Sequence, residues 1–515
     1  MRSIYQALQR VAKQLTVSAL CSVLLVVRAD AQTIVRSFDG DTGPVQERCN
    51  TGELRCGRQA EMAAAANGKQ VLQVTWQHVN IYDYNGKLLH STTLPDFIRN
   101  AGLDPIPRPP SRPGVTDHGP FEPHIVFDEF IGRWIMTVTC LNDCFMVSAS
   151  ADAAGAWRGV YLSCLQGGPC LNADPALQIG YDKNGVYYCG GHLGDENPHT
   201  IRGVAYDCFA IPPAEVKAVA QGKEPAHVNR RHNMVMHVRP AVDQNPRKAA
   251  NAPALFAARS CSRAEPGGCQ RAVNFPFEWI VTPFIWHGAT GSYGSDQALK
   301  TAVGSRQNRW LYNTLCCGQK SAVPQAGSPI EVRAAESHRL NNLVQSGSHL
   351  EIVFASGPCT HDCGAQGADT NNVMFWADVD CSDSAACTVD QTAKIASGEI
   401  NPLFPTIGVD NQGNVGIVAA SSSSAAYLSI LLWTHRAADP GGVITGPMTV
   451  VSGTKPYTCP NNLNLALIAS AVVMMTVQDP LDRSRLWTTH QYAADATACV
   501  WNSRIIEYRP SAGDR

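Results

Sequence analysis

The 515-residue sequence carries little charge, and neither sign dominates. Lys and Arg total 41 and Asp and Glu total 43, so the formal net charge at neutral pH is −2. A nucleic-acid-binding protein would show a basic excess, and binding to anionic lipid would need a polybasic cluster. The balance therefore argues against both kinds of partner. Charged residues make up only 16% of the chain, whereas Gly and Pro contribute 42 and 32 residues, which indicates many turns and few surface helices.

Helical periodicity, long apolar runs and common enzyme motifs are also scarce. Only residues 213–221 (PAEVKAVAQ) read as a convincing helix, with Pro at the start. The uncharged run 463–477 has about 15 residues, which is too short to span a membrane. We expect two buried strands there, or one strand and its entry. No His-Glu-x-x-His, Gly-x-Ser-x-Gly or Cys-x-x-Cys-His pattern occurs, so no zinc protease, hydrolase elbow or c-type haem site is indicated.

The first 31 residues have the features of an export signal. Three basic residues precede an apolar run at 15–27, and Ala29-Asp30-Ala31 has the small-x-small form of a cleavage site. We therefore expect a mature chain that starts at Gln32 and is secreted or periplasmic, with no membrane span after cleavage. An uncleaved anchor is the alternative.

The sequence contains 19 cysteines, of which Cys21 lies in the signal. The remaining even number, in an exported protein, favours disulfides. In Cys359-Thr-His361-Asp-Cys363 a zinc site is the alternative, but no second ligand pair with matching spacing follows. Cys316 and Cys317 either form a vicinal disulfide or pair elsewhere. The pairs suggested by spacing are Cys49/Cys56, Cys140/Cys144, Cys164/Cys170, Cys189/Cys208, Cys261/Cys269, Cys359/Cys363, Cys381/Cys387 and Cys459/Cys499.

From about residue 70 to residue 508 the chain consists of short alternating apolar segments bounded by Gly, Pro, Asn or Asp, which is typical of strands. A loose repeat runs through them: Pro, a strand, then Asp with Gly three or four residues later. Copies begin at Pro123, Pro175 and Pro405, and residues 82–86 form a partial copy. The repeat Asp residues are spaced regularly: 45 residues separate Asp83 from Asp128, and 54 residues separate Asp128 from Asp182. This period is typical of propeller blades.

The fold expected from this repeat is all-β: a single β-propeller with loops stiffened by disulfides. At roughly 50–65 residues per blade, seven blades are favoured, with six or eight as alternatives. The expected organisation is a signal peptide (1–31), an N-terminal extension (32–69), the propeller (70–508) and a C-terminal tail (509–515). Two β-sandwich domains would also give short strands with regular turns, but no Pro/Ser-rich linker divides the region.

Four passages carry a family resemblance: residues 126–135 (VFDEFIGRWI), 150–157 (SADAAGAW), 405–440 and 478–505. They resemble a family of secreted bacterial β-propellers that mostly lack an assigned function, and the resemblance covers most of residues 70–508. It implies the fold and export, and hardly any activity. The second passage is also similar to the Asp-box of sialidase-like propellers, which is a turn device. One departure is the apolar run 463–477, where the family tends to have Trp-Gly-Asp-Tyr.

The ligand site of a propeller is usually the mouth of its central channel, so residues that open the first strand of each repeat are candidates. These are Glu122, His124, Asp174 and Asn401. Glu122 and Asp174 with His124 could supply acid and base for glycoside cleavage. The alternative is that the two carboxylates only cap strand openings beside Pro.

Basic side chains near the blade turns are a second set of candidates. Arg133, Arg436 and Arg504 could bind an acidic sugar, with Asn401 as a further ligand-binding residue, or the arginines could brace the blades. No cofactor is expected, with calcium as the exception. Residues 410–414 (DNQGN) and 39–41 (DGD) offer oxygens to calcium, but neither fits the twelve-residue loop pattern, so a turn is favoured for each.

We therefore expect an exported propeller that binds a glycan or an extracellular protein at its channel face, with no evident catalysis. The second hypothesis is a glycan-active hydrolase or lyase that works from the channel mouth. The third is a structural or adhesive component of the cell envelope.

Overall fold

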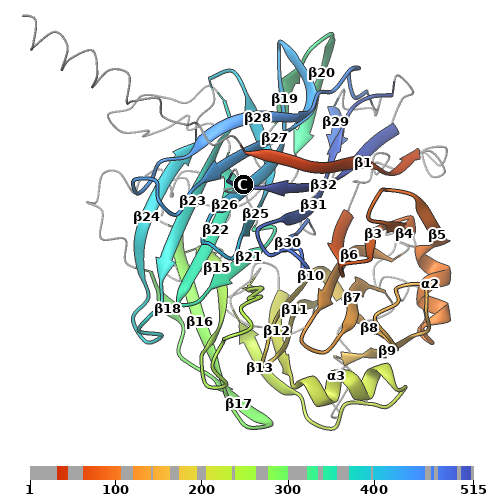
Figure 1. The fold of residues 1–515 in the computed structure, drawn as a ribbon, viewed down its shortest axis with the longest axis vertical. Coiled ribbons are helices and arrows are strands. Elements are labelled where there is room, and N and C mark those ends of the chain that lie inside the picture. Colours follow the sequence, from red (N-terminus) through yellow and green to blue (C-terminus); the bar gives the residue numbers. More distant parts are fainter. Residues whose placement is uncertain are drawn as a thin grey trace, which may run out of the picture.

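The computed structural model describes residues 32–44, 62–105, 120–140, 143–162, 173–193, 204–234, 238–261, 277–299, 322–334, 340–356, 371–395, 398–458, 465–468, 474–495 and 500–511. Within these residues the strands form seven blade sheets and one additional three-stranded sheet. Figure 1 shows the blades arranged in a ring, viewed along its short axis. The expected all-β, seven-bladed propeller is confirmed.

The first four blades follow one another along the chain. Blade 1 contains β2 (Met62–Ala66), β3 (Gln70–Thr75), β4 (His78–Asp83) and β5 (Leu88–Thr93). Blade 2 contains β6 (Phe121–Asp128), β7 (Arg133–Thr139), β8 (Asp143–Ser148) and β9 (Trp157–Tyr161). Blade 3 contains β10 (Ala173–Asp182), β11 (Gly185–Leu193), β12 (Val204–Ile211) and β13 (Asn229–Met234). Blade 4 contains β14 (Arg239–Pro240), β15 (Ala254–Cys261), β16 (Phe277–His287), β17 (Thr290–Tyr293) and β18 (Gln297–Ala298).

The remaining blades complete the ring. Blade 5 contains β21 (Leu343–Ser346), β22 (His349–Ser356), β23 (Val373–Asp380) and β24 (Thr388–Ile395). Blade 6 contains β25 (Asn401–Val409), β26 (Val415–Ser423), β27 (Ala426–His435) and β28 (Thr445–Val451). Blade 7 contains β30 (Thr476–Gln478), β31 (Leu486–Tyr492), β32 (Val500–Arg509) and β1 (Thr33–Pro44). The additional sheet contains β19 (Ala322–Gln325), β20 (Ser328–Ala334) and β29 (Leu465–Ile468).

Blade 7 is built from both ends of the chain. β1 pairs antiparallel with β32, from Thr33 opposite Arg509 to Pro44 opposite Val500, and the two strands lie side by side in Figure 1, β1 in red and β32 in blue. Closure of this kind leaves the ring without a gap between its last and first blades.

The expected boundary at residue 70 corresponds to the second strand of blade 1. Both β1 and β2 lie within residues 32–69, so these residues contribute two strands to the blades. Neither strand shows a simple alternation. β1 has two register shifts in its pairing with β32. β2 consists of five residues, mostly Ala, and all five are buried. A strand buried on both faces has no polar side to reveal it.

The sequence repeat marks the innermost strand of several blades. Asp128, Asp182 and Asp410 each end or follow such a strand, and each side chain accepts backbone N–H groups of the turn that follows. Asp83 does not belong to this set, because it closes the turn between the third and fourth strands of blade 1. The spacing from Asp83 to Asp128 therefore crosses blade positions, although the fold it suggested is correct.

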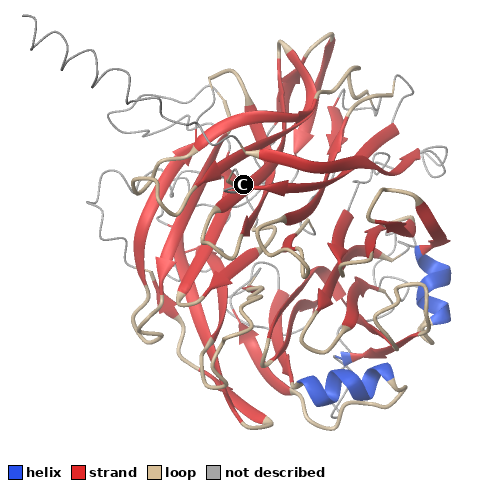
Figure 2. Cartoon of the chain, in the orientation of Figure 1, coloured by secondary structure: helices blue, strands red, loops and turns tan. Residues whose placement is uncertain are grey.

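Two short helices lie at the rim of the ring (Figure 2). α3 (Pro213–Ala220) confirms the expected helix, with Pro at its start. α2 (Leu94–Asn100) was not expected; its first turn is capped by Thr93, whose side-chain oxygen accepts the Asp96 N–H. In the described part of the chain, neither helix has the length and apolar character needed to cross a membrane.

The apolar run 463–477 holds two strands, as expected, but they belong to different sheets. β29 pairs parallel with β20 in the additional sheet, while β30 is the innermost strand of blade 7.

Three of the expected disulfides are present: Cys140–Cys144, Cys189–Cys208 and Cys381–Cys387. The second joins β11 and β12 of blade 3, and the other two close short loops in blades 2 and 5. Disulfides of this kind persist in oxidising compartments. The other suggested pairs, including Cys316 and Cys317, involve side chains outside the described residues.

Candidate functional site

A cavity of about 460 Å³ lies at the end of the ring axis where the innermost strands finish. Its wall comes from four blades, and each contributes the end of its first strand and the turn that follows. Blade 4 supplies residues 242–247, blade 5 supplies 344–347, blade 6 supplies 409–411, and blade 7 supplies Thr476, Gln478 and Arg483. These segments are far apart in sequence and meet only because the ring closes.

Three glutamines form the fixed part of this wall. Gln244 accepts the Gln478 N–H at 2.6 Å and donates to the Gln478 carbonyl at 3.3 Å, so it joins blade 4 to blade 7. The Gln478 amide donates to the Val409 carbonyl of blade 6 at 2.8 Å. Gln345 of blade 5 accepts the Leu255 N–H and donates to the Pro253 carbonyl in blade 4. Because these amides are bonded to backbone, the wall is held rigidly before any ligand arrives.

An ion pair also lies beside the cavity. Arg483, in the turn between β30 and β31, contacts Glu129 of blade 2 at 2.7 Å. The same guanidinium donates to the Gln244 carbonyl and to the Gln478 side chain. Glu129 in turn accepts a hydrogen bond from the Gln244 amide at 3.1 Å. Burial raises the pKa of Glu129, and Arg483 counteracts that rise. The pair therefore links blades 2, 4 and 7.

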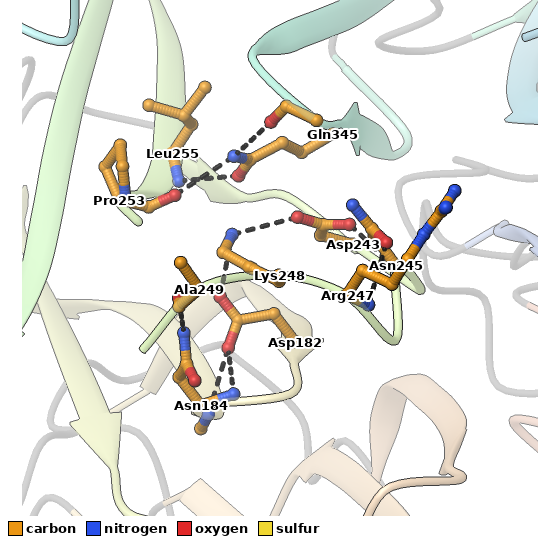
Figure 3. Close-up of polar contacts among 12 residues, drawn as sticks. Asp182, Asn184, Asp243, Asn245, Arg247, Lys248, Ala249, Pro253, Leu255 and Gln345 are labelled. Atoms are coloured by element: carbon orange, nitrogen blue, oxygen red, sulfur yellow. Dashed lines mark hydrogen bonds and ion pairs between the residues drawn. The ribbon is translucent and has the colours of Figure 1, made fainter. Parts of the chain in front are cut away.

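A buried lysine holds the blade 4 turn in place (Figure 3). The Lys248 ammonium lies 2.9 Å from Asp182 and 2.9 Å from Asp243, and all three side chains are at most 3% exposed. Asp182 belongs to blade 3, so this triad joins blades 3 and 4. Burial raises the pKa of Asp243, and Lys248 opposes the rise. The two carboxylates raise the pKa of Lys248 above its usual value, against its burial.

The rim of the cavity differs from its wall, because several of its side chains remain available. Arg247 and Asn411 are exposed, and Asn245 and Ser346 are half-buried. Among the described residues, no hydrogen bond or ion pair engages the Arg247 guanidinium, the Asn411 amide group or the Ser346 hydroxyl. Asn245 uses its carbonyl oxygen to accept the Arg247 N–H. The two lining carboxylates, Asp243 and Asp410, are already occupied by Lys248 and by turn N–H groups.

The residues expected at the channel mouth lie near the starts of innermost strands, and this cavity lies where such strands end. Glu122 and His124 are buried at the beginning of β6, where Glu122 has a positive φ of 52° ahead of Pro123. His124 contacts Gln178 of blade 3 at 3.2 Å, so the structure does bring two adjacent blades together there. Asp174 lies opposite Gly191 in the same blade 3 sheet, and its side chain is outside the described set.

The remaining predicted residues serve the blades individually. Asn401, buried at the start of β25, accepts the Asn372 N–H and donates to the Ser422 carbonyl. Arg133 donates to the neighbouring Gly132 carbonyl, and Arg436 pairs with Asp439 at 2.8 Å. Arg504 binds Ser37 and Asp39 of β1. None of the residues predicted to act in catalysis or ligand binding lines the cavity, although Asp410 and Asn411 of the calcium candidate 410–414 do.

The calcium candidates also have internal partners. Asp410 accepts the N–H groups of Gln412 and Asn414 and the Asn414 side-chain amide, which is the turn arrangement. In β1, Asp41 accepts the Thr75 hydroxyl at 2.7 Å.

One sequence signal could have pointed to the cavity. Pro240-Ala241-Val242-Asp243 is a shortened copy of the Pro–strand–Asp repeat, and Asp243 holds the position of the repeat Asp in blade 4. The rim residues Asn245 and Arg247 follow directly in the turn. This copy is hard to recognise in the sequence because its strand, β14, has only two residues.

No family model matches the sequence, and no curated protein matches it. Among solved structures, extracellular domains 1 and 2 of Drosophila semaphorin 1a have a TM-score of 0.43 at 9% identity, covering 93% of this chain and 88% of that chain. An ulvan lyase from a new polysaccharide lyase family has a TM-score of 0.41 at 11% sequence identity, covering 94% of this chain and 96% of that chain. The Trypanosoma rangeli sialidase has a TM-score of 0.35 at 8% sequence identity, covering 92% of this chain and 60% of that chain.

Asp128 gives a testable pH dependence near the site. Burial raises its pKa to about 7, although the Phe130 and Ile131 N–H groups favour the charged form. A folded pKa above the unfolded value means that this group stabilises the fold when protonated and loses that contribution as the pH rises from about 4 to about 7. We expect Asp128→Asn, which keeps an acceptor oxygen, to gain a few kcal/mol relative to the wild type between pH 4.5 and pH 8, at roughly 1.4 kcal/mol per pKa unit.

Urea unfolding at both pH values measures this gain. Asp83→Asn is the matched control, because the Asp83 side chain also accepts backbone N–H groups of a turn, in a less buried position. An equal pH dependence in the wild type and Asp128→Asn would contradict the assignment.

Proposed function

We propose that this protein is an exported binding propeller that takes a short saccharide into the cavity at the end of its ring axis. One observation carries the proposal: a cavity of about 460 Å³ has a rigid wall and a rim of available polar side chains. Small-ligand sites commonly have volumes of roughly 300–1,000 Å³ and a few well-placed polar groups.

The chemistry of the rim supports a ligand rich in hydroxyl groups. Asn245 and Asn411 can donate and accept, Ser346 can do both through one hydroxyl, and Arg247 can only donate. Such a mixture pairs with hydroxyls, which also donate and accept. Arg247 is the lining cation without an ion pair among the described residues, and its planar guanidinium also suits a sugar carboxylate.

The rigid wall supports binding for an energetic reason. A ligand that orders loops on arrival has to offset the lost conformational freedom, whereas a preorganised site avoids that cost. The hydrogen bonds of Gln244, Gln345 and Gln478 already join all four contributing blades. Export is supported by the leader-like segment 1–31 and by the disulfides.

Binding to an array of short neutral and uronic-acid oligosaccharides, followed by calorimetry, tests the proposal. We expect Arg247→Ala and Asn411→Ala each to weaken binding of the best ligand by about tenfold, since one good hydrogen bond to a charged or polar partner contributes about 1–2 kcal/mol. A larger loss for Arg247→Ala with uronic acids than with neutral sugars would identify the carboxylate as its partner.

Arg99→Ala is the control, because Arg99 is an exposed arginine on α2 that pairs only locally with Asp96. The absence of any saccharide ligand, or a ligand whose affinity neither rim variant changes, would overturn the proposal.

A further inference from the structure

A group of potential metal ligands lies on blade 5, away from the cavity wall. His349 of β22, Asp378 of β23 and Asp390 of β24 place one ligand atom each within 4.8 Å of one another. The His349 Nδ1 lies 2.8 Å from the Asp378 Oδ1. Three adjacent strands therefore present one nitrogen and two carboxylates to a common point.

A β-bulge directs the third ligand. Asp378 lies opposite Gln391, but the next residue, Val379, lies opposite Val389, so Asp390 is the additional residue of the bulge. In a regular strand Asp390 and Gln391 would point to opposite faces. A bulge redirects one side chain, and bulges are frequent beside functional sites.

Asp378 lies beside a second buried carboxylate, so its surroundings favour a bound cation. Asp378 lies directly opposite Glu351 in the β22–β23 pair, and both residues are only 6% exposed. Glu351 accepts the Trp376 indole N–H at 2.7 Å, and Asp378 accepts the Gln391 amide at 3.2 Å. In the described part of the chain no Lys or Arg forms an ion pair with either carboxylate. Two neighbouring buried carboxylates are stable together only if one is protonated or a cation is present.

From these observations we propose that His349, Asp378 and Asp390 bind a divalent first-row transition ion. Imidazole nitrogen favours zinc and its neighbours, whereas calcium takes only oxygen ligands. Zinc binds nitrogen and oxygen at about 2.0–2.2 Å, so the His349 and Asp378 ligand atoms, 2.8 Å apart, have to separate slightly and the Asp390 carboxylate has to adjust its position. The exposed Asp390 side chain can make that movement. Three protein ligands leave a position for water, as in open zinc sites.

Calorimetric titration of the EDTA-treated, dialysed protein with Zn²⁺ tests the site. We expect one ion per chain in the wild type and at least tenfold weaker binding in His349→Gln and in Asp390→Asn, with weaker binding of Ca²⁺ than of Zn²⁺. Thermal unfolding gives a second readout, because an ion that binds only the folded state raises Tm with its concentration. The Zn²⁺-dependent rise should be lost in both variants.

Two controls match the substituted residues. His287→Gln replaces an imidazole that contacts only Ser292 among the described residues, and Asp383→Asn replaces an exposed carboxylate in the turn between β23 and β24. Both should bind Zn²⁺ as the wild type does. The proposal is overturned if the wild type binds no stoichiometric Zn²⁺, if its affinity survives in His349→Gln and Asp390→Asn, or if Ca²⁺ binds as tightly as Zn²⁺.

Discussion

Replacement of Lys248 by Met is expected to lower the free energy of unfolding by about 3–5 kcal/mol, because it leaves two carboxylates buried without their cation. Asp182 and Asp243 are both at most 2% exposed and each lies 2.9 Å from the Lys248 ammonium. Asp182 retains hydrogen bonds from the Asn184 and Gly185 N–H groups and from the Tyr187 hydroxyl, but none of these supplies a full positive charge.

Denaturation in urea at pH 7.5 measures this loss, and pH provides an internal check. Without Lys248 the pKa of Asp243 should rise further, so this carboxyl should take up a proton on acidification in the folded state. The difference between the variant and the wild type should therefore shrink as the pH falls toward 5. A second substitution, Asp243→Asn, should recover part of the loss in the Lys248→Met background by removing one uncompensated charge.

Lys87→Met is the control for Lys248→Met, because Lys87 is exposed in the blade 1 turn. A Lys248→Met protein as stable as the Lys87→Met protein would show that the triad contributes nothing. Since Asp243 lines the cavity and Asn245 follows it, the Lys248→Met protein should also bind saccharide more weakly. The Lys248→Met/Asp243→Asn double variant separates the two effects. It should recover part of the stability, but it does not restore the ion pair that holds the turn.

The fold could be predicted because its signal is local. Each copy of the repeat places Pro at a strand opening and Asp with Gly at the following turn, and the Asp side chain bonds to N–H groups only two to four residues away. Such interactions lie within a short window of sequence. They are visible without knowledge of the rest of the chain.

The strands that escaped prediction lack that local signal. β2 is nearly all Ala, and its burial pattern depends on β6 and β31, which come from other blades. β1 has bulges, and its pairing partner β32 lies more than 450 residues away. Long-range pairing overrides local propensity at both places.

The site could be predicted only in part, for a related reason. The cavity lies at the ring axis, the region that the sequence indicated, but a propeller has two faces, and the sequence does not say which face leaves a cavity. That choice depends on contacts such as the one between Gln244 and Gln478, separated by 234 residues. At the opposite end His124 and Gln178 contact each other, and Asn401 bonds to backbone.

Removal of β1 is expected to have the largest effect of any change considered for this protein. A chain of residues 45–515, compared with one of residues 32–515 made under the same oxidising conditions, should lose cooperative unfolding or aggregate. Without β1, the whole length of β32 becomes an open sheet edge, and exposed edges pair with other chains. The buried Glu507 also loses its 3.0 Å contact with Arg36.

β1 also joins blade 7 to blade 1, so its loss should open the ring itself. The Asp41 N–H donates to the Gln73 side chain of blade 1, the Asp41 carboxylate accepts the Thr75 hydroxyl, and the Ser503 hydroxyl of blade 7 donates to the Asp41 carbonyl. A synthetic peptide of residues 32–46 added to the 45–515 chain should therefore restore a single cooperative transition, whereas a peptide of the same composition in scrambled order should not. Equal Tm values for the two chains, or rescue by the scrambled peptide, would show that the ring closes without this strand.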